Sequence, residues 1–340
     1  PAHAFAGTRL DHAAWEDRAF GTGPFKVQQW RRGDRIILVP NPYFSPKPKL
    51  ARVELRMIPD GNSSFVALRT RDVDIAQLTT AQMRDAARGL RGIDILRTPS
   101  NGTIWISVQT ARPPGDDARV RQALAYAVDM RSIRKTFANQ YPQAASFLPP
   151  VMTQWYDSSM RPYPYDLQRA RALLGGKPMD AVLVIAGENP MWARLATPVQ
   201  QELAQAGVRL IIKKYPAALF NAADGPIRNG RFTMTIDGWI GGADPEQSVP
   251  FACSQANVNG NNISRYCDPK FDALLQDQAV TASETRRRLD FVQMQRMVHS
   301  ALPVIPIYYM TYFDGVQSRV HGFARNMLEY PVAPERWDSL

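Results

Sequence analysis

The chain has 340 residues, 45% of them hydrophobic, so it can bury one large core or two smaller ones. This composition does not favour a disordered chain, and no apolar run reaches the roughly 18 residues that span a bilayer. The net charge is +10 at pH 7, but the basic residues are scattered, in groups no larger than Arg286-Arg287-Arg288. Because no nucleic-acid-binding motif accompanies the charge, we expect a solvated basic surface and no nucleic-acid partner.

The first part of the chain predicts a sheet followed by a helix. Strand-like segments lie at residues 34–41, 53–58 and 103–109. Residues 68–76 resemble the end of a helix leading into a short strand, and Ser100-Asn101-Gly102 is prone to form a turn. From Asp117, which can cap a helix, the apolar spacing becomes helical, and the helix is expected to end near Asp129.

The second part predicts a βαβ unit and two further helices. The proline-rich residues 142–164 should be irregular. A strand, a helix and a strand are then expected at residues 182–186, 192–206 and 208–215. This order favours a partly parallel sheet. Two more strands are expected at residues 232–239 and 304–309. Two more helices are expected, one from Asp268-Pro269 onward and one over residues 283–301.

Two cysteines, Cys253 and Cys267, lie 14 positions apart in a polar segment rich in asparagine and glycine. A disulfide between them would stabilise the fold by on the order of 3 kcal/mol and would indicate an oxidising compartment. The alternative is a pair of reduced thiols in a cytosolic protein. No histidine lies near enough in sequence to complete a zinc site, so no metal is expected.

The sequence gives little support for catalysis. The four histidines, His3, His12, His299 and His321, lie far apart and beside no partner at a catalytic spacing. Nucleophile-elbow, Walker A and zinc-protease motifs are absent from the sequence. We therefore expect no catalytic residue, no cofactor and no enzymatic activity. Aromatic residues near turns, such as Trp105 and Trp239, favour a ligand-binding cleft, although each alone is more often a core residue.

Several stretches, in order along nearly the whole chain, share the pattern of one family. They are residues 21–27 (GTGPFKV), 39–44 (VPNPYF), 71–75 (RDVDI), 117–129 (DARVRQALAYAVD), 165–174, 266–275 and 303–309. The chain thereby resembles the bacterial extracellular solute-binding proteins of family 5, the oligopeptide, dipeptide and nickel binders. The resemblance implies the periplasmic or extracytoplasmic substrate-binding component of an ABC importer, which captures a small solute, most simply a short peptide, for a membrane permease.

The resemblance also implies an α/β, two-lobed periplasmic-binding-protein fold of the type II kind, whose hinged lobes close on the ligand. Lobe I is expected to comprise residues 1–129 and 314–340, and lobe II residues 130–313. Residues 1–5 (PAHAF) resemble a family stretch that normally follows a substantial N-terminal segment. Lobe I is therefore expected to be incomplete at its N-terminus, with the export signal outside this chain.

Family peptide binders use a Gly-Trp-x-x-Asp turn whose aspartate pairs with the peptide amino terminus. Gly238 and Trp239 keep its beginning, but Gly242 stands at the acidic position and Asp244 is the nearest carboxylate. Either Asp244 takes over the ammonium contact, or the ligand has no free amino terminus. The expected ligand-binding residues are Asn101, Thr103, Trp105, Trp239, Ile240, Gly241, Gly242 and Asp244.

Three alternatives to peptide import stay open. A ligand-sensing regulatory module could use the same fold, and the solute could be something other than a peptide. A chain that lacks part of its cleft wall could also bind nothing.

Overall fold

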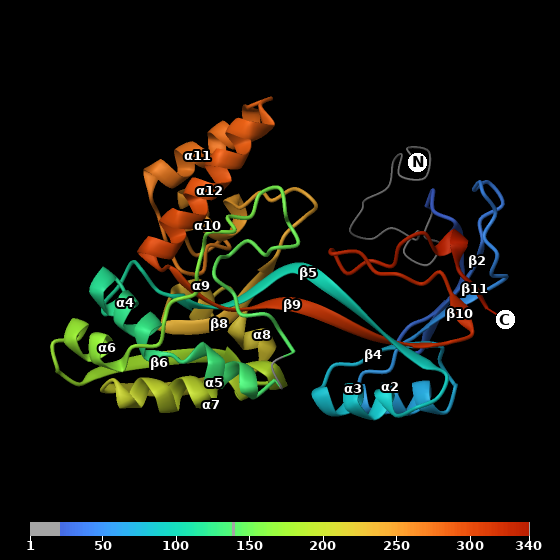
Figure 1. Cartoon of the computed structure of the whole chain (residues 1–340), viewed down its shortest axis with the longest axis horizontal. Helices are drawn as coiled ribbons and strands as arrows, with labels where there is room; N and C mark the ends of the chain where they lie inside the picture. Colours follow the sequence, from blue (N-terminus) through green and yellow to red (C-terminus); the bar gives the residue numbers. More distant parts are fainter. Residues whose placement is uncertain (1–20, 138–139, 340) are drawn as a thin grey trace. The chain divides into compact units, whose positions relative to one another are not determined.

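The computed structural model of the protein describes residues 21–137 and 140–339. Within this range the chain forms two compact units, which divide after Thr98 and after Thr311 (Figure 1). The first unit contains the residues before and after these two points, and the second unit runs between them. The family-like residues 1–5 lie outside the described residues. The expected division into hinged lobes is not tested by these units and stays a prediction.

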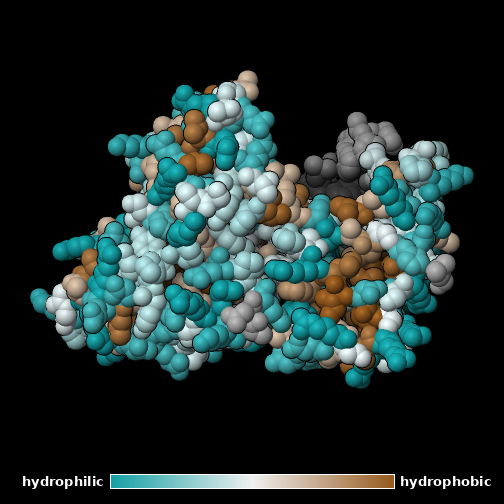
Figure 2. Space-filling view, viewed as in Figure 1, coloured by the Kyte–Doolittle hydropathy of each residue, from teal (hydrophilic) through white to brown (hydrophobic). Residues whose placement is uncertain are grey.

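The first unit is built from an antiparallel three-stranded sheet and two short helices. Its elements are β1 (Phe25–Arg31), β2 (Arg35–Pro40), β3 (Val53–Arg56), α2 (Gly61–Arg69), β4 (Ile75–Gln77), α3 (Ala81–Arg88), β10 (Val320–His321), a 3-10 turn (Pro334–Arg336) and β11 (Asp338–Ser339). The strands expected at residues 34–41 and 53–58 are confirmed. In one view, hydrophobic residues gather on this unit near β4, whereas the second unit presents mostly hydrophilic residues (Figure 2).

The second unit contains most of a six-stranded sheet, ordered β4-β9-β5-β8-β6-β7. Its strands are β5 (Ile93–Val108), β6 (Met179–Ala186), β7 (Val208–Tyr215), β8 (Met234–Ile240) and β9 (Val304–Gln317). The long strands β5 and β9 each begin in one unit and end in the other. β6 pairs in parallel with both β7 and β8, while β5 and β8 are antiparallel. The expected βαβ unit and partly parallel sheet are confirmed.

Capping residues explain where the helices of the second unit begin. These helices are α4 (Ala118–Ala127), α5 (Met130–Lys135), α6 (Leu167–Leu173), α7 (Pro190–Gln205), α8 (Ala217–Phe220), α9 (Pro226–Asn229), α10 (Ser248–Phe251), a 3-10 turn (Cys253–Gln255), α11 (Pro269–Val280) and α12 (Glu284–Ala301). The side chains of Asp117, Asp268 and Ser283 accept hydrogen bonds from the first turns of α4, α11 and α12. The helices expected at these three places are confirmed.

The prediction of a turn at Ser100-Asn101-Gly102 is wrong. These residues belong to β5, where Gly102 pairs with Ile240 of β8. A Cβ on Gly102 would lie 2.6 Å from Met310 Sδ and 2.9 Å from Ile240 Cγ1. The glycine therefore serves close packing inside the sheet, and pairing with neighbouring strands overrides the local preference of these residues for a turn.

The disulfide between Cys253 and Cys267 is present, as expected. Inside the loop that it closes, Asn262 is fully buried, and its Nδ2 donates hydrogen bonds to the carbonyls of Ala252 (3.2 Å) and Tyr266 (2.7 Å). The loop is thus held by a covalent bond and by a buried amide. Among the helices of the described residues, none has the length and apolar character needed to cross a bilayer.

Candidate ligand-binding site

Four of the eight predicted ligand-binding residues lie on one face of the β5–β8 pair. Thr103 is paired with Trp239, and Trp105 with Asp237. Directly paired residues of antiparallel strands share a face, and alternate residues along a strand do too. Asn101 therefore joins these four residues on the face, which we name the β5–β8 face. Ile240 lies on the opposite face, beside Gly102, so the structure does not bring its side chain to the other candidates.

Asn101 forms hydrogen bonds with the loop that follows β8. Its Nδ2 donates to the carbonyls of Gly241 (2.7 Å) and Gly242 (2.8 Å). A Cβ placed on Gly241 would lie 3.7 Å from Asn101 Nδ2, 3.7 Å from Trp239 Nε1 and 4.0 Å from Gln247 Nε2. Three side-chain nitrogens from two strands and the following loop therefore converge on the backbone of Gly241.

Polar atoms without hydrogen-bond partners gather at the same place. Among the described residues, the buried atoms Asn101 Oδ1, Thr103 Oγ1, Trp239 Nε1 and Gln247 Oε1 all lack a partner. Thr103 is completely buried, and Asn101 is 5% exposed. Buried polar groups in native proteins are almost always paired, and leaving one unpaired costs about 1–3 kcal/mol. Such a concentration is expected where a ligand supplies the missing partners. Gln247 was not predicted, because nothing in the sequence distinguishes it from an ordinary loop residue.

Trp105 combines a core position with a polar edge. It is 3% exposed, and its ring lies 5.9 Å from that of Phe251 in α10. No described atom accepts a hydrogen bond from its Nε1, yet this group lies near enough to Asp237 to lower the pKa of that carboxyl. Trp105 is therefore the part of the β5–β8 face that packs against α10.

Asp244 is already neutralised by a side chain of α12. Both of its carboxylate oxygens accept hydrogen bonds from Arg287, at 2.6 and 2.7 Å. The Arg287 guanidinium also lies 5.0 Å above the ring of Trp155 and donates to Gln278. Asp244 therefore ties the loop after β8 to α12. An ammonium ligand would have to share or displace Arg287 to bind it.

Asp237 is the carboxylate on the β5–β8 face that sequence reasoning missed. Ser107 Oγ donates to its two oxygens, at 2.9 and 3.1 Å. Burial raises the pKa of Asp237 to about 7, although the hydrogen bond from Ser107 and the nearby indole N–H of Trp105 act in the opposite direction. The sequence does offer a signal, an acidic residue inside a mostly apolar strand, two positions before Trp239.

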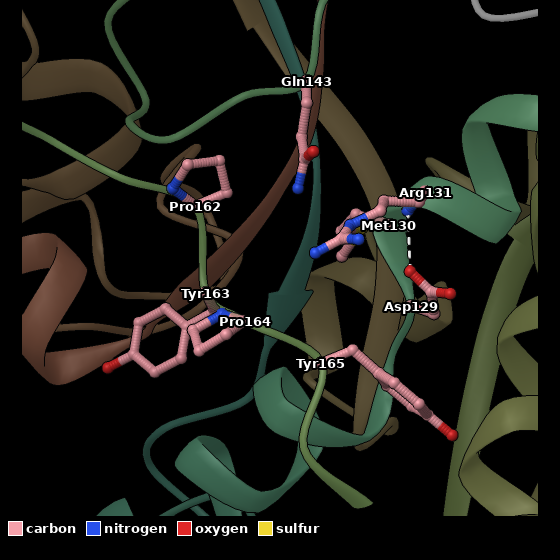
Figure 3. Close-up of a pocket in the computed structure, with 8 residues that line it drawn as sticks. All are labelled: Asp129, Met130, Arg131, Gln143, Pro162, Tyr163, Pro164 and Tyr165. Carbon is pink, nitrogen blue, oxygen red and sulfur yellow. Dashed lines mark hydrogen bonds between the residues drawn. The ribbon is translucent and has the colours of Figure 1, made fainter.

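A separate pocket lies between the start of α5 and the irregular segment 142–164 (Figure 3). Its lining consists of Asp129, Met130, Arg131, Gln143, Pro162, Tyr163, Pro164 and Tyr165. Asp129 accepts a hydrogen bond from the backbone N–H of Arg131 (2.9 Å). The volume is about 190 Å³, whereas ligand pockets usually measure about 300–1,000 Å³. None of the predicted residues lines it, and we assign it no ligand.

Comparison with known proteins identifies relatives over most of the chain. Residues 5–260 match the model of the bacterial extracellular solute-binding proteins, family 5 middle. Di/tripeptide-binding protein 2 of Pseudomonas aeruginosa is 29% identical over 319 residues, which are 90% of this chain and 59% of that protein. Heme-binding protein A of Haemophilus influenzae is 27% identical over 327 residues, 93% of this chain and 59% of that protein. The chain thus spans 59% of the length of each relative.

Solved structures confirm the expected fold class. The oligopeptide-binding protein AppA from Bacillus subtilis, solved with a nonapeptide, matches with a TM-score of 0.83 at 21% identity. The match covers 100% of this chain and 71% of that chain. This likeness shows that the α/β architecture is that of the two-lobed periplasmic binding proteins.

Proposed function

Because the chain belongs to family 5 of the bacterial extracellular solute-binding proteins, we propose that it captures a short peptide and delivers it to the membrane permease of an ABC importer. Relatives that bind di- and tripeptides support the peptide as ligand. The disulfide supports an oxidising, extracytoplasmic location. Membership of a family of binding proteins also supports a role without catalysis.

The observation that carries this proposal is the β5–β8 face. It combines two tryptophans with buried polar atoms of Asn101, Thr103 and Trp239 that lack partners within the described chain. Extended peptides present alternating amide N–H and C=O groups, which can satisfy donors and acceptors placed along a strand. Tryptophan rings add contact area for peptide side chains at little entropic cost. In this proposal the loop from Ile240 to Asp244 borders the peptide.

Replacement of Trp239 tests the proposal. Trp239→Ala should weaken peptide binding by more than about tenfold, because an indole at the centre of a binding site contributes both contact and a hydrogen bond. Binding is measured by isothermal titration calorimetry with peptides selected by thermal shift. Trp192→Ala is the matched control, since the Trp192 ring packs on the apolar cluster around Val184 and Phe220. It should lower stability without changing affinity. An unchanged dissociation constant in Trp239→Ala would remove Trp239 from the site.

A non-peptide solute is the second candidate, because one relative is named as a heme-binding protein. Native mass spectrometry of the protein as purified distinguishes the two ligands directly. A bound mass equal to a di- to pentapeptide supports peptide capture. Retention of heme, together with no thermal shift from any peptide, would replace the peptide by heme in the proposal.

A further inference from the structure

Asp237 is a carboxylate without a cationic partner in the part of the chain that the structure describes. The groups that act on its pKa from the neighbouring strand are Ser107 and Trp105, both neutral, and no charged side chain contributes. By contrast, Asp244 receives two hydrogen bonds from Arg287. The two carboxylates near the site therefore differ in what they can still bind.

The position of Asp237 suits a ligand cation. It lies directly opposite Trp105 and two residues before Trp239, so both indole-bearing positions flank it on the β5–β8 face. Aromatic rings attract cations through their electron-rich faces, and the ionised carboxylate of Asp237 adds a negative charge beside them. Desolvation of an unneutralised carboxylate is unfavourable. A ligand ammonium would remove this penalty, because it favours the ionised form.

We propose that Asp237, flanked by Trp105 and Trp239, is the subsite for a primary ammonium group of the ligand. This inference rests on the proposed function for the location of the binding site. The ammonium belongs either to a peptide amino terminus or to a lysine-like side chain, since both carry the same chemistry. Asp237 thereby sets specificity from the strand, while Asp244 remains bound to Arg287 and holds the loop.

Three dipeptides separate these sources. Ala-Phe carries an amino-terminal ammonium, N-acetyl-Ala-Lys carries a side-chain ammonium, and N-acetyl-Ala-Phe carries neither. Dissociation constants are measured by calorimetry for the wild-type chain, Asp237→Asn and Asp244→Asn. Asparagine keeps the size of the side chain and can still accept a hydrogen bond from Ser107. Thermal unfolding of each variant checks the fold.

We expect the wild-type chain to bind one of the two ammonium peptides about tenfold or more tightly than N-acetyl-Ala-Phe, in line with a charged hydrogen bond. Asp237→Asn should abolish this preference while binding of N-acetyl-Ala-Phe persists, and Asp244→Asn should retain the preference. The proposal would be overturned if Asp244→Asn abolished the preference for the ammonium peptide, or if Asp237→Asn retained it.

The outcomes also distinguish the subsite from peptide capture. Equal binding of all three peptides by the wild-type chain overturns the subsite and leaves peptide capture standing. If no peptide binds, n-butylammonium is the next probe. Its binding, abolished in Asp237→Asn, overturns peptide capture and supports the ammonium subsite, whereas its failure to bind overturns both.

Discussion

The polar network around Gln295 and the β5–β8 face lie in the same unit, and both contain buried polar atoms. Gln295 Oε1 accepts hydrogen bonds from Ser146 Oγ (3.0 Å) and the Asp157 backbone N–H (3.2 Å). Its Nε2 donates to the carbonyls of Trp155 (2.9 Å) and Phe291 (3.0 Å). Every polar atom of this side chain is used. On the β5–β8 face, polar atoms at the same depth lack partners within the described residues.

This difference separates polar groups that hold the fold from those available to a ligand. The Gln295 network attaches Ser146, Trp155 and Asp157 to α12. These three residues belong to no strand or helix that would pair their backbone. The β5–β8 face belongs to a sheet whose backbone is already paired. The side chains of this face are therefore not needed to satisfy the backbone, and they can serve ligand binding at some cost to stability.

The largest effect is expected from breaking the satisfied network. Gln295→Leu should lower the free energy of unfolding by about 3 kcal/mol, because it leaves the Ser146 hydroxyl, the Asp157 N–H and the Trp155 carbonyl without this partner in the interior. Chemical denaturation monitored by circular dichroism measures this loss. Gln201→Leu, on the exposed face of α7, is the control and should stay within about 0.5 kcal/mol of wild type. Equal stability of Gln295→Leu and wild type would contradict the structural role.

How well the sequence predicts each feature depends on how local its physical cause is. Capping by Asp117 and Asp268 is decided within a few residues, so the starts of α4 and α11 could be predicted. The prediction of a turn at residues 100–102 is wrong, because the position of β5 inside the six-stranded sheet depends on strands far away in sequence. The Asp244–Arg287 pair spans 43 positions, so no local pattern could reveal that this aspartate is already neutralised.

An intermediate effect is expected from the charge of Asp237. Its pKa in the folded chain is about 7, against 3.8 for an ordinary aspartate. The unfolded chain therefore releases this proton first, and stability falls as the pH rises from about 4 through 7. Asp237→Asn lacks this proton equilibrium. At pH 8 it should be more stable than wild type by on the order of 2 kcal/mol, with little difference near pH 4.

The comparison between wild type and Asp237→Asn is necessary because Glu202 titrates in the same range. Burial also raises the pKa of Glu202 to about 7. Its contribution is common to both chains and cancels in the difference between their unfolding midpoints, measured by calorimetry from pH 4 to 8. A stability difference that does not change with pH would show that Asp237 carries no buried charge.

The smallest effect should come from Thr103, which has a matched partner in Thr235. Both threonines are completely buried on the β5–β8 face. Thr235 Oγ1 donates to the carbonyl of Val184 (2.8 Å), whereas Thr103 Oγ1 has no partner among the described residues. Valine keeps the shape of threonine and removes the hydroxyl. Thr235→Val should therefore cost about 1 kcal/mol, and Thr103→Val should stay within about 0.5 kcal/mol of wild type.

Ligand affinity should follow the opposite order. If the Thr103 hydroxyl forms a hydrogen bond with the ligand, Thr103→Val should weaken ligand binding by about fivefold, which corresponds to one neutral hydrogen bond. Thr235→Val should leave the affinity unchanged. Denaturation and calorimetry on the same two variants measure both quantities. Equal losses of stability in the two variants would mean that Thr103 is bonded within the protein. The unpartnered polar atoms of the β5–β8 face would then no longer indicate where a ligand binds.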